Sequence, residues 1–391
     1  MRRKSTVGKN RSLTIGIIVI GTLFLVSGNL LLKMYLSNAD GDVNAQQIEN
    51  HLNRSTAVNG KEFEAKMTLA AIGDILIHDR VYEDAEIADG YDFKPMLKAV
   101  KPELLQPEIL LANQETILAG TEIGLSSYPS FNSPQEVGDA IIDAGVDIVS
   151  TANNHTLDRG ERGALASIDY WNKVGLPYVG SFKDTADQQR LRILNQDGIK
   201  LAFLSYTYGT NGIPVPVGKD YLVNLIDKEK IKEEVHRARQ VADVVVMSIH
   251  WGNEYQRFPD NQQQDLAAFM AEEGVDVIFG HHPHVLQPMD WITNSDGRKT
   301  FIIYSLGNFL SGQMWDYKDI GGMASIDITK HSANGETTIQ LDNPQFYPTF
   351  VASKGQRNYR VVPLLEAGKH GLENAEAKYT ETVSHVFQFI K

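Results

Sequence analysis

Short apolar runs alternate with amphipathic stretches over most of the chain, and this alternation limits the fold more than any other feature of the sequence. The runs lie at 67–72, 108–112, 146–150, 200–206, 243–249, 275–279 and 300–306. Near-continuous apolar runs of this length are typical of strands buried on both faces. Strands that alternate with helices predict an α/β domain.

Helix signals lie between these runs. Ser133-Pro134-Gln135-Glu136 has the pattern of a capping box with proline at the first helical position, and Gly145 would end that helix. Further helices are expected at about 163–173, 227–241 and 261–273.

The C-terminal part has a different pattern. Runs at 323–328, 337–341 and 345–350 have no helical stretch between them, which predicts an antiparallel meander. In segment 371–391 the apolar residues recur on one helical face, so we expect a C-terminal amphipathic helix that docks on the domain or on a partner.

The N-terminus predicts a membrane anchor. A basic tail at 1–11 is followed by a stretch from Ser12 to Leu32 without any charged residue. At about 1.5 Å per residue that stretch spans roughly 30 Å, the thickness of the hydrocarbon layer. We therefore expect a transmembrane signal-anchor helix at 12–36, with the basic tail in the cytoplasm and the rest of this single-pass cell-membrane protein extracellular.

A cleaved signal peptide is the alternative, because Ser37-Asn38-Ala39 is compatible with a cleavage site. Signal peptides normally have an apolar stretch of only about 7–15 residues, which favours the anchor. A polar linker at 37–66 then leads to the main domain, expected at 67–370.

Composition excludes several kinds of site. The chain has no cysteine, which excludes disulfides, thiolate zinc sites and cysteine nucleophiles. Its net charge of −12 argues against binding of nucleic acid by the main domain. No glycine-rich nucleotide-binding loop is present in the sequence.

Polar side chains follow five of the apolar runs, at the point where each expected strand ends. They are Gly73-Asp74, Asn113-Gln114-Glu115, Asn153-Asn154-His155, His250-Trp251-Gly252 and Gly280-His281-His282-Pro283-His284. In open α/β sheets, ligands bind outside the carboxyl ends of the strands. We therefore expect these groups to share one cleft.

Imidazole and carboxylate groups indicate a metal site. They suit zinc, manganese or iron, and two such ions about 3.5–4 Å apart can clamp a phosphoryl group and activate water. His282 and His284 are two residues apart, so they share a face in an extended loop, whereas we expect His281 to point away. Asn113 and Glu115 have the same spacing, and the residues alone do not decide between them.

In this order the motifs resemble the calcineurin-like metallophosphoesterase superfamily, and within it the poly-γ-glutamate capsule biosynthesis family called CapA or PgsA. The matching motifs are Gly73-Asp74, Asn113-Gln114-Glu115, Asn153-Asn154-His155-Thr156-Leu157-Asp158, His250-Trp251-Gly252-Asn253-Glu254-Tyr255, His282-Pro283-His284 and Ser305-Leu306-Gly307-Asn308-Phe309. They span roughly 67–310, which is most of the main domain.

This resemblance implies a four-layer αββα metallophosphoesterase-like sandwich with one or two divalent ions, manganese or zinc. It implies metal ligands at Asp74, Glu115 or Asn113, Asn154, His250, His282 and His284. His155 matches the general acid that protonates a leaving group, and Asp158 is expected to orient it.

The first motif departs from the wider superfamily, which has Asp-x-His there. Leu76 stands at the histidine position. His78 lies four residues after Asp74 and would substitute only if the loop turns back.

Three further residues are candidates for substrate binding. Glu254 and Tyr255 are expected to line the cleft or only to hold its loop. For Asn308 the alternative is a structural turn residue in left-handed backbone.

Three functions are compatible with these features. The first is a membrane-anchored extracytoplasmic subunit required for poly-γ-glutamate capsule synthesis or export, whose partners are other membrane subunits of a synthase complex, the polymer and the membrane. The second is a free-standing metal-dependent hydrolase of phosphoester or amide bonds. The third is a catalytically inert scaffold of the synthase complex.

Overall fold

A computed structural model describes residues 62–390, in which residues 63–332 and 337–390 form one compact unit. The predicted tail at 1–11, the predicted transmembrane helix at 12–36 and most of the predicted linker lie outside the described residues. Within residues 62–390, no helix is both long and apolar enough to cross a membrane.

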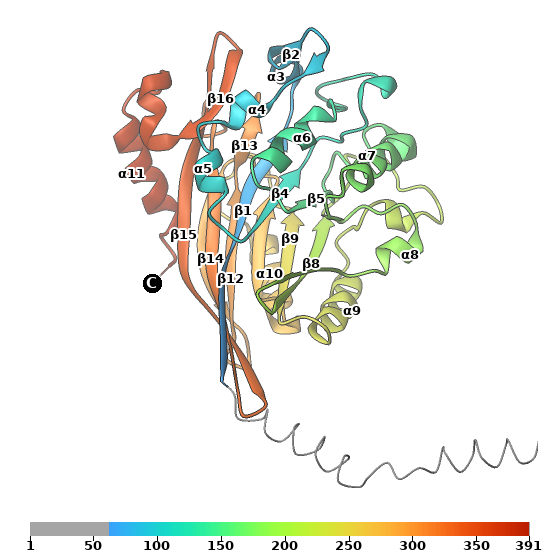
Figure 1. Cartoon of the computed structure of the whole chain (residues 1–391), viewed down its shortest axis with the longest axis vertical. Coiled ribbons are helices and arrows are strands. Elements are labelled where there is room, and N and C mark those ends of the chain that lie inside the picture. The colour runs from blue at the N-terminus through green and yellow to red at the C-terminus, as the bar shows by residue number, and fades with distance from the viewer. Residues whose placement is uncertain (1–61, 391) are drawn as a thin grey trace, which may run out of the picture. The chain divides into compact units, whose positions relative to one another are not determined.

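The first sheet has eight strands (Figure 1). In spatial order they are β16 (Arg357–Pro363), β15 (Glu336–Lys354), β14 (Ile320–Ala333), β1 (Phe63–Leu76), β4 (Ile109–Gln114), β5 (Ile148–Ser150) and β6 (Tyr178–Val179), with β13 (Asn308–Ser311) pairing with the end of β1. β1, β4, β5 and β6 run parallel, while β14 is antiparallel to β1.

The second sheet has six strands. In spatial order they are β11 (Leu286–Thr293), β12 (Lys299–Leu306), β10 (Val277–His281), β9 (Val244–His250), β8 (Ile199–Thr207) and β7 (Arg192–Gln196). The four central strands are parallel, and the two outer strands are antiparallel to their neighbours. A separate ribbon joins β2 (Glu86–Ile87) to β3 (Gly90–Tyr91).

The two sheets pack face to face, and alternation along the strands explains why. In β9, Val244 and Val246 belong to the core shared with the first sheet, whereas Val245 and Met247 pack among residues of α9 (Lys228–Arg239) and α10 (Asn261–Glu273). Successive strand side chains point to opposite faces, so a strand that is apolar throughout is covered on both. The predicted α/β class is confirmed.

The remaining helices lie against the first sheet, against β11 at the edge of the second sheet, or in connections between strands. Their bounds are α3 (Asp79–Asp84), α4 (Lys94–Leu97), α5 (Lys101–Leu104), α6 (Glu136–Asp143), α7 (Gly160–Val174), α8 (Thr185–Gln188) and α11 (Ala375–Val386), with short 3-10 helices η1 (Thr121–Ile123), η2 (Asp220–Leu222) and η3 (Leu364–His370). Side chains of α6 and α7, such as Ile141 and Trp171, belong to the same core as the first sheet.

The predicted helices are present near their predicted positions, but one predicted N-terminal cap is not formed. α10 begins with a capping box between Asp260 and Gln263, and Gly274 ends it in left-handed backbone. The capping box predicted at Ser133 is wrong, because α6 begins later and has no side-chain cap. The Ser133 hydroxyl instead donates to the Thr116 hydroxyl, since this segment crosses a buried loop.

One boundary, the start of β1, differs from the prediction, whereas the expected C-terminal helix and meander are present. β1 begins at Phe63, within the segment predicted to be linker, because its first residues pair with β14. The predicted C-terminal helix is present as α11, where Val386 is buried and Tyr379 packs against the core. The expected meander is β14, β15 and β16, and two of its runs merge in the long strand β15.

Candidate metal centre

Two glycines allow the strands that carry the site to come close together. A Cβ at Gly73 would lie 2.1 Å from the Gly307 carbonyl oxygen, and the next amide, of Asp74, donates to that oxygen at 2.9 Å. A Cβ at Gly280 would lie 2.0 Å from the Tyr304 carbonyl oxygen. These separations exclude any side chain at the residue before Asp74 and at the residue before His281.

Strand register brings the polar ends together. Asp74 pairs with Asn113 across β1 and β4, and His281 pairs with His250 across β10 and β9. The expectation that polar strand ends share one region is therefore confirmed for these residues.

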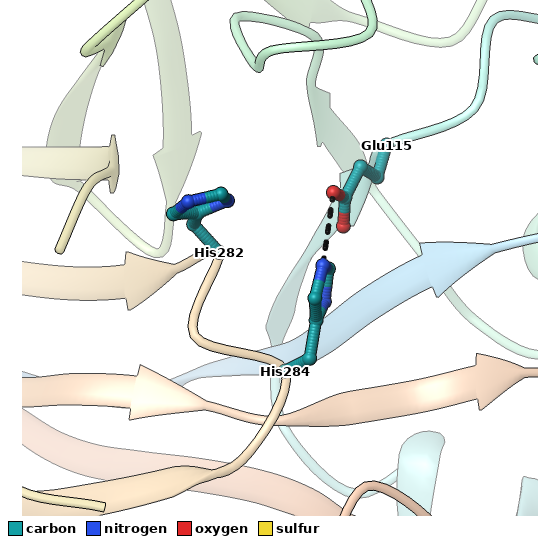
Figure 2. Close-up of side chains that lie close together, drawn as sticks. All are labelled: Glu115, His282 and His284. Atoms are coloured by element: carbon teal, nitrogen blue, oxygen red, sulfur yellow. Dashed lines mark ion pairs between the residues drawn. The ribbon is translucent and has the colours of Figure 1, made fainter. Parts of the chain in front are cut away.

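Glu115, His282 and His284 form a buried cluster whose possible ligand atoms all lie within 4.8 Å of one another (Figure 2). Glu115 lies just after β4, and the two histidines lie in the connection between β10 and β11. His282 has a φ of 97° and His284 a φ of 59°, which are uncommon values for residues other than glycine. Unfavourable backbone of this kind is found where a surrounding structure holds functional side chains in place.

Buried atoms of this cluster have no hydrogen-bond partner among the described residues. They include both carboxylate oxygens of Glu115 and Nδ1 of His282. Burial raises the pKa of Glu115 well above its usual range, and the negative charges of Asp74 and Glu254 add to the rise. Burial also lowers the pKa of His282 to about 3, so its ring is neutral at pH 7. A carboxylate and two imidazoles with free lone pairs fit a divalent metal ion.

Asp74 contacts His284, and the ligand role that the family resemblance implies for Asp74 stays a prediction. Its Oδ2 lies 3.0 Å from His284 Nδ1, which leaves His284 Nε2 facing Glu115 Oε1 at 3.7 Å. Burial alone would raise the pKa of Asp74, but contacts with His281 and His284 outweigh it and hold that pKa well below its usual range. Carboxylates commonly fix metal-binding imidazoles in this way.

His250, at the end of β9 in the second sheet, and Asn154, after β5 in the first sheet, extend the network. His250 Nε2 lies 2.8 Å from Asn154 Oδ1 and 3.7 Å from Glu115 Oε1. Its Nδ1 lies 3.5 Å from the amide nitrogen of Asn113, which also donates to Asp74 Oδ1 at 2.8 Å. Glu115 thus lies between two imidazoles, while Asn113 links Asp74 to His250, so both residues of this pair belong to the site.

His155 lies beside this network with the predicted partner. Its Nδ1 is 2.7 Å from Asp158 Oδ2, which also accepts the Phe131 amide at 2.6 Å. Its Nε2 is 3.3 Å from the Asn154 amide nitrogen, and the Phe131 ring packs edge-on at 4.7 Å between centroids. The expectation that Asp158 orients His155 agrees with this geometry.

One expectation near the site was wrong. His281 does not point away, because its Nδ1 lies 3.3 Å from Asp74 Oδ1 in the buried interior. It is the last residue of β10, and the turn that follows breaks the alternation on which the prediction rested. His78 Nδ1 lies 3.2 Å from the Gly312 amide nitrogen and 3.1 Å from the Leu76 carbonyl oxygen, so backbone occupies this ring nitrogen. A ligand role for His78 stays a prediction.

Asn308 holds backbone segments next to the metal centre through hydrogen bonds. It is fully buried, so the predicted substrate contact does not fit this structure. Its amide donates to the carbonyl oxygens of His284 and Lys318 at 3.3 and 2.8 Å. The left-handed residue is Gly307, with a φ of 65°, whereas Asn308 opens strand β13. Glycine takes that conformation because it has no Cβ.

Glu254 and Tyr255 lie exposed beside the cluster. The Tyr255 amide donates to the Pro283 carbonyl at 2.7 Å, and its ring lies 6.2 Å from that of His284. Burial and the neighbouring Glu254 raise the pKa of Tyr255 to about 12, so the hydroxyl stays protonated. Both readings of this pair, as cleft residues and as loop holders, agree with these contacts.

Sequence reasoning missed Tyr208 and Asn211. The Tyr208 ring lies 4.6 Å from that of His282 and 6.3 Å from that of His250. Asn211 accepts from the Asn154 amide at 3.2 Å. Tyr208 directly follows β8, so the same inspection of strand ends would have found it, whereas Asn211 lies in a loop and carries no signal.

Comparisons with known proteins agree with this set of motifs. A family model described as bacterial capsule synthesis protein PGA_cap matches residues 68–313. A capsule biosynthesis protein CapA from Bacillus anthracis is 30% identical over 263 residues, covering 64% of this chain and 61% of that protein. The PGA biosynthesis protein CapA of Bacillus subtilis is 34% identical over 246 residues, covering 62% and 63%. The matches thus span less than two thirds of these relatives.

Among solved structures, the NAD nucleotidase of Haemophilus influenzae matches 82% of this chain and 67% of its own, with a TM-score of 0.44 and 14% identity. A likeness this weak supports no conclusion about activity.

Proposed function

Because the chain belongs to the bacterial capsule synthesis protein family, we propose that it is a subunit required for the synthesis or export of poly-γ-glutamate, acting through its metal-binding site. The names of two Bacillus relatives refer to capsule and PGA biosynthesis, which supports this proposal. In this proposal the domain is a metallophosphoesterase-like sandwich used within a synthase complex of other membrane subunits.

One observation carries the metal-binding part of the proposal. The carboxylate oxygens of Glu115 are buried without hydrogen-bond partners among the described residues, beside two histidines. A buried carboxylate is strongly destabilising unless something compensates its charge. A divalent ion, manganese or zinc, as one ion or two, supplies that compensation and attracts anionic oxygen atoms.

We also propose that segment 12–36 anchors the protein in the cell membrane with the main domain outside. Its support is the uncharged stretch behind a basic tail. This position would bring the domain close to a polymer as it leaves the cell.

A deletion strain tests the proposal. We expect deletion to abolish surface poly-γ-glutamate, and wild-type chain supplied in trans to restore it. A chain carrying E115A, H282A and H284A should not restore it, whereas the exposed histidine variant H370A should. Normal surface polymer in the deletion strain would contradict the function, and full rescue by the triple variant would leave only a scaffold role.

A metal-dependent hydrolase is the second candidate, favoured by the His155–Asp158 pair. Asp158 accepts from His155 Nδ1, which fixes the tautomer and leaves Nε2 toward Asn154. The buried carboxylate thus holds the ring in one orientation, and a proton donor must be positioned in this way to reach a leaving group. In this candidate function Asp158 orients His155, and His155 delivers a proton to the leaving group.

Turnover by the purified protein separates these functions. With Mn²⁺ or Zn²⁺ present, a hydrolase should cleave a generic phosphodiester or polyglutamate, and H155A should slow it by about 10²-fold or more. Equal rates for H155A and wild type would remove His155 from catalysis. Metal analysis tests the third possibility, because less than roughly a tenth of an equivalent of metal after chelator-free purification favours an inert scaffold.

A further inference from the structure

A loop with unusual backbone lies beside the metal centre. Trp315, Asp316 and Tyr317 have φ values of 61°, 50° and 67°. Three successive residues other than glycine in this region are costly, by about 1 kcal/mol or more each, and persist only where surrounding contacts hold them. Contacts on two sides of this loop hold it in place and position the side chain of Lys318.

The outer side of the loop is fixed to the C-terminal helix. The Tyr317 ring has the Arg257 guanidinium at 3.8 Å and the Lys378 ammonium at 4.3 Å. The Tyr317 hydroxyl donates to Glu381 of α11, which also pairs with Arg257 at 3.2 Å. Helix α11 therefore braces two loops at once, one containing Arg257 and one containing Tyr317.

The inner side of the loop is fixed to the metal centre. Asn308 donates to the Lys318 carbonyl and also to the His284 carbonyl. Gln313, at the start of the loop, donates to the Tyr255 hydroxyl at 3.4 Å. The backbone of Lys318 is thus positioned relative to His284 through one buried amide.

The loop presents the ammonium of Lys318. That group lies 5.1 Å from the centre of the Tyr255 ring, and the centre of the same ring lies 6.2 Å from that of the His284 ring. Its ion-pair partner is Asp316, at 3.5 Å, whose side chain is 89% exposed. The Lys318 side chain itself is 23% exposed, so the pair is open to water mainly at its Asp316 end. A partner as exposed as Asp316 contributes little, so water or an anionic ligand that reaches Lys318 competes for its charge.

We propose that Lys318 binds a carboxylate of an acidic polymer while a neighbouring unit of the same polymer occupies the metal centre. The proposal rests on the proposed function and names the residue that recognises the substrate's charge. Tyr255 forms the floor between the two positions, and Glu254 next to it disfavours a further carboxylate. An ammonium held over an aromatic ring beside a metal site binds anionic oxygen and does not require one particular backbone.

Binding measurements on the full-length protein in detergent, loaded with Mn²⁺, test this. The probes are a γ-linked glutamate hexamer, the same hexamer with its α-carboxylates amidated, and inorganic phosphate. We expect K318M to weaken binding of the acidic hexamer roughly tenfold, and K318R to retain most of it. E254Q should bind the acidic hexamer more tightly, the opposite sign, by about twofold to fivefold.

The control is K66M, which removes the same charge from β1, eight residues or about 26 Å before Asp74. It should bind the acidic hexamer as wild type does, and the amidated hexamer should bind equally to all variants. If wild type binds the acidic hexamer and K318M binds it equally well, the assignment of Lys318 is wrong. If K318M weakens only the binding of phosphate, the proposal that Lys318 recognises a carboxylate is wrong. If wild type does not bind the acidic hexamer, the proposed function itself fails.

Discussion

Two buried polar clusters lie in this domain, and they differ in whether their charges are satisfied. One is the ion pair of Asp187 and Arg192, at the edge where β7 begins. The other is the metal centre of Glu115, His282 and His284. Both bury ionisable groups beside apolar side chains, yet only the first has a partner for each charge.

In the first cluster each polar group has a partner. Arg192 pairs with Asp187 Oδ1 at 2.7 Å and donates to the carbonyl oxygens of Tyr178 and Asp187. Asp187 Oδ2 accepts the Tyr178 hydroxyl at 2.9 Å, and the guanidinium lies over the rings of Tyr178 and Phe182. Such a cluster is complete without a ligand and serves the fold.

The metal centre differs because the protein leaves it incomplete. Glu115 has two buried oxygens without hydrogen-bond partners among residues 62–390, and the two histidines near it have unfavourable backbone. A domain keeps such a cluster only if a ligand compensates or if selection acts on function. The comparison shows that buried charges with partners serve the fold, whereas buried charges without partners indicate a functional site.

The largest expected effect is on the satisfied cluster. R192M would leave Asp187 buried and unpaired, and we expect the free energy of unfolding to fall by about 3–5 kcal/mol. Denaturant unfolding measures this, and metal content should not change. R190M, two residues away and exposed, is the control and should change stability by less than about 0.5 kcal/mol. A loss that small for R192M would contradict the assignment of this cluster as structural.

Removing the charge of Glu115 from the metal centre should raise the free energy of unfolding, whereas removing Arg192 should lower it. E115Q removes a carboxylate whose burial is uncompensated, so we expect the metal-free protein to become more stable by about 1–2 kcal/mol. The same variant should lose bound metal, which elemental analysis measures. E122Q, an exposed glutamate on η1, should change neither quantity. Destabilisation of metal-free E115Q would show that Glu115 is structural after all.

A third, exposed ionic cluster surrounds Glu381 on α11, and we expect its charge to have a smaller effect on stability than the two buried clusters. Burial alone would raise the pKa of Glu381, but Lys378, Tyr317 and Arg257 lower it to about 2. A carboxylate whose folded pKa is depressed stabilises the fold above its unfolded pKa of about 4.5, and this contribution disappears as pH falls toward 2.

We therefore expect wild type to lose stability relative to E381Q as the pH falls from about 5 to 2. The difference should stay below about 1 kcal/mol, because the group is exposed and solvent screens it. Thermal unfolding across that pH range measures it, with E376Q on the same helix as the control. A difference between wild type and E381Q that does not depend on pH would contradict this account.

Much of the fold was predictable because burial on both faces makes the parallel strands apolar throughout. Each of the seven apolar runs became a strand, from β1 to β12. Residues at strand ends, such as Asp74 and His250, could be grouped because parallel strands end at the same edge. The satisfied pair of Asp187 and Arg192 could not be recognised, since isolated charged residues in sequence give no sign of burial.

The residues that the sequence misplaced lie where the chain turns. The position of His281 was wrong because period-two alternation stops at the end of β10. The hydrogen bonds of Asn308 to His284 and Lys318 were not foreseen, because they depend on how the connection after β10 packs against the loop after β13. Lys318 carried no local signal at all, since its position depends on Tyr255, Asn308 and the brace from α11.

The sequence by itself therefore determined the class of fold, the family and the chemical nature of the site, because apolar patterning and motif order are local properties. Only the tertiary structure decided that Asp74 lies beside His284, that the Glu115 oxygens have no hydrogen-bond partner among the described residues, and where Lys318 lies relative to Tyr255. The contact between Asp74 and His284 joins segments 210 residues apart, and such contacts arise only when the two sheets pack.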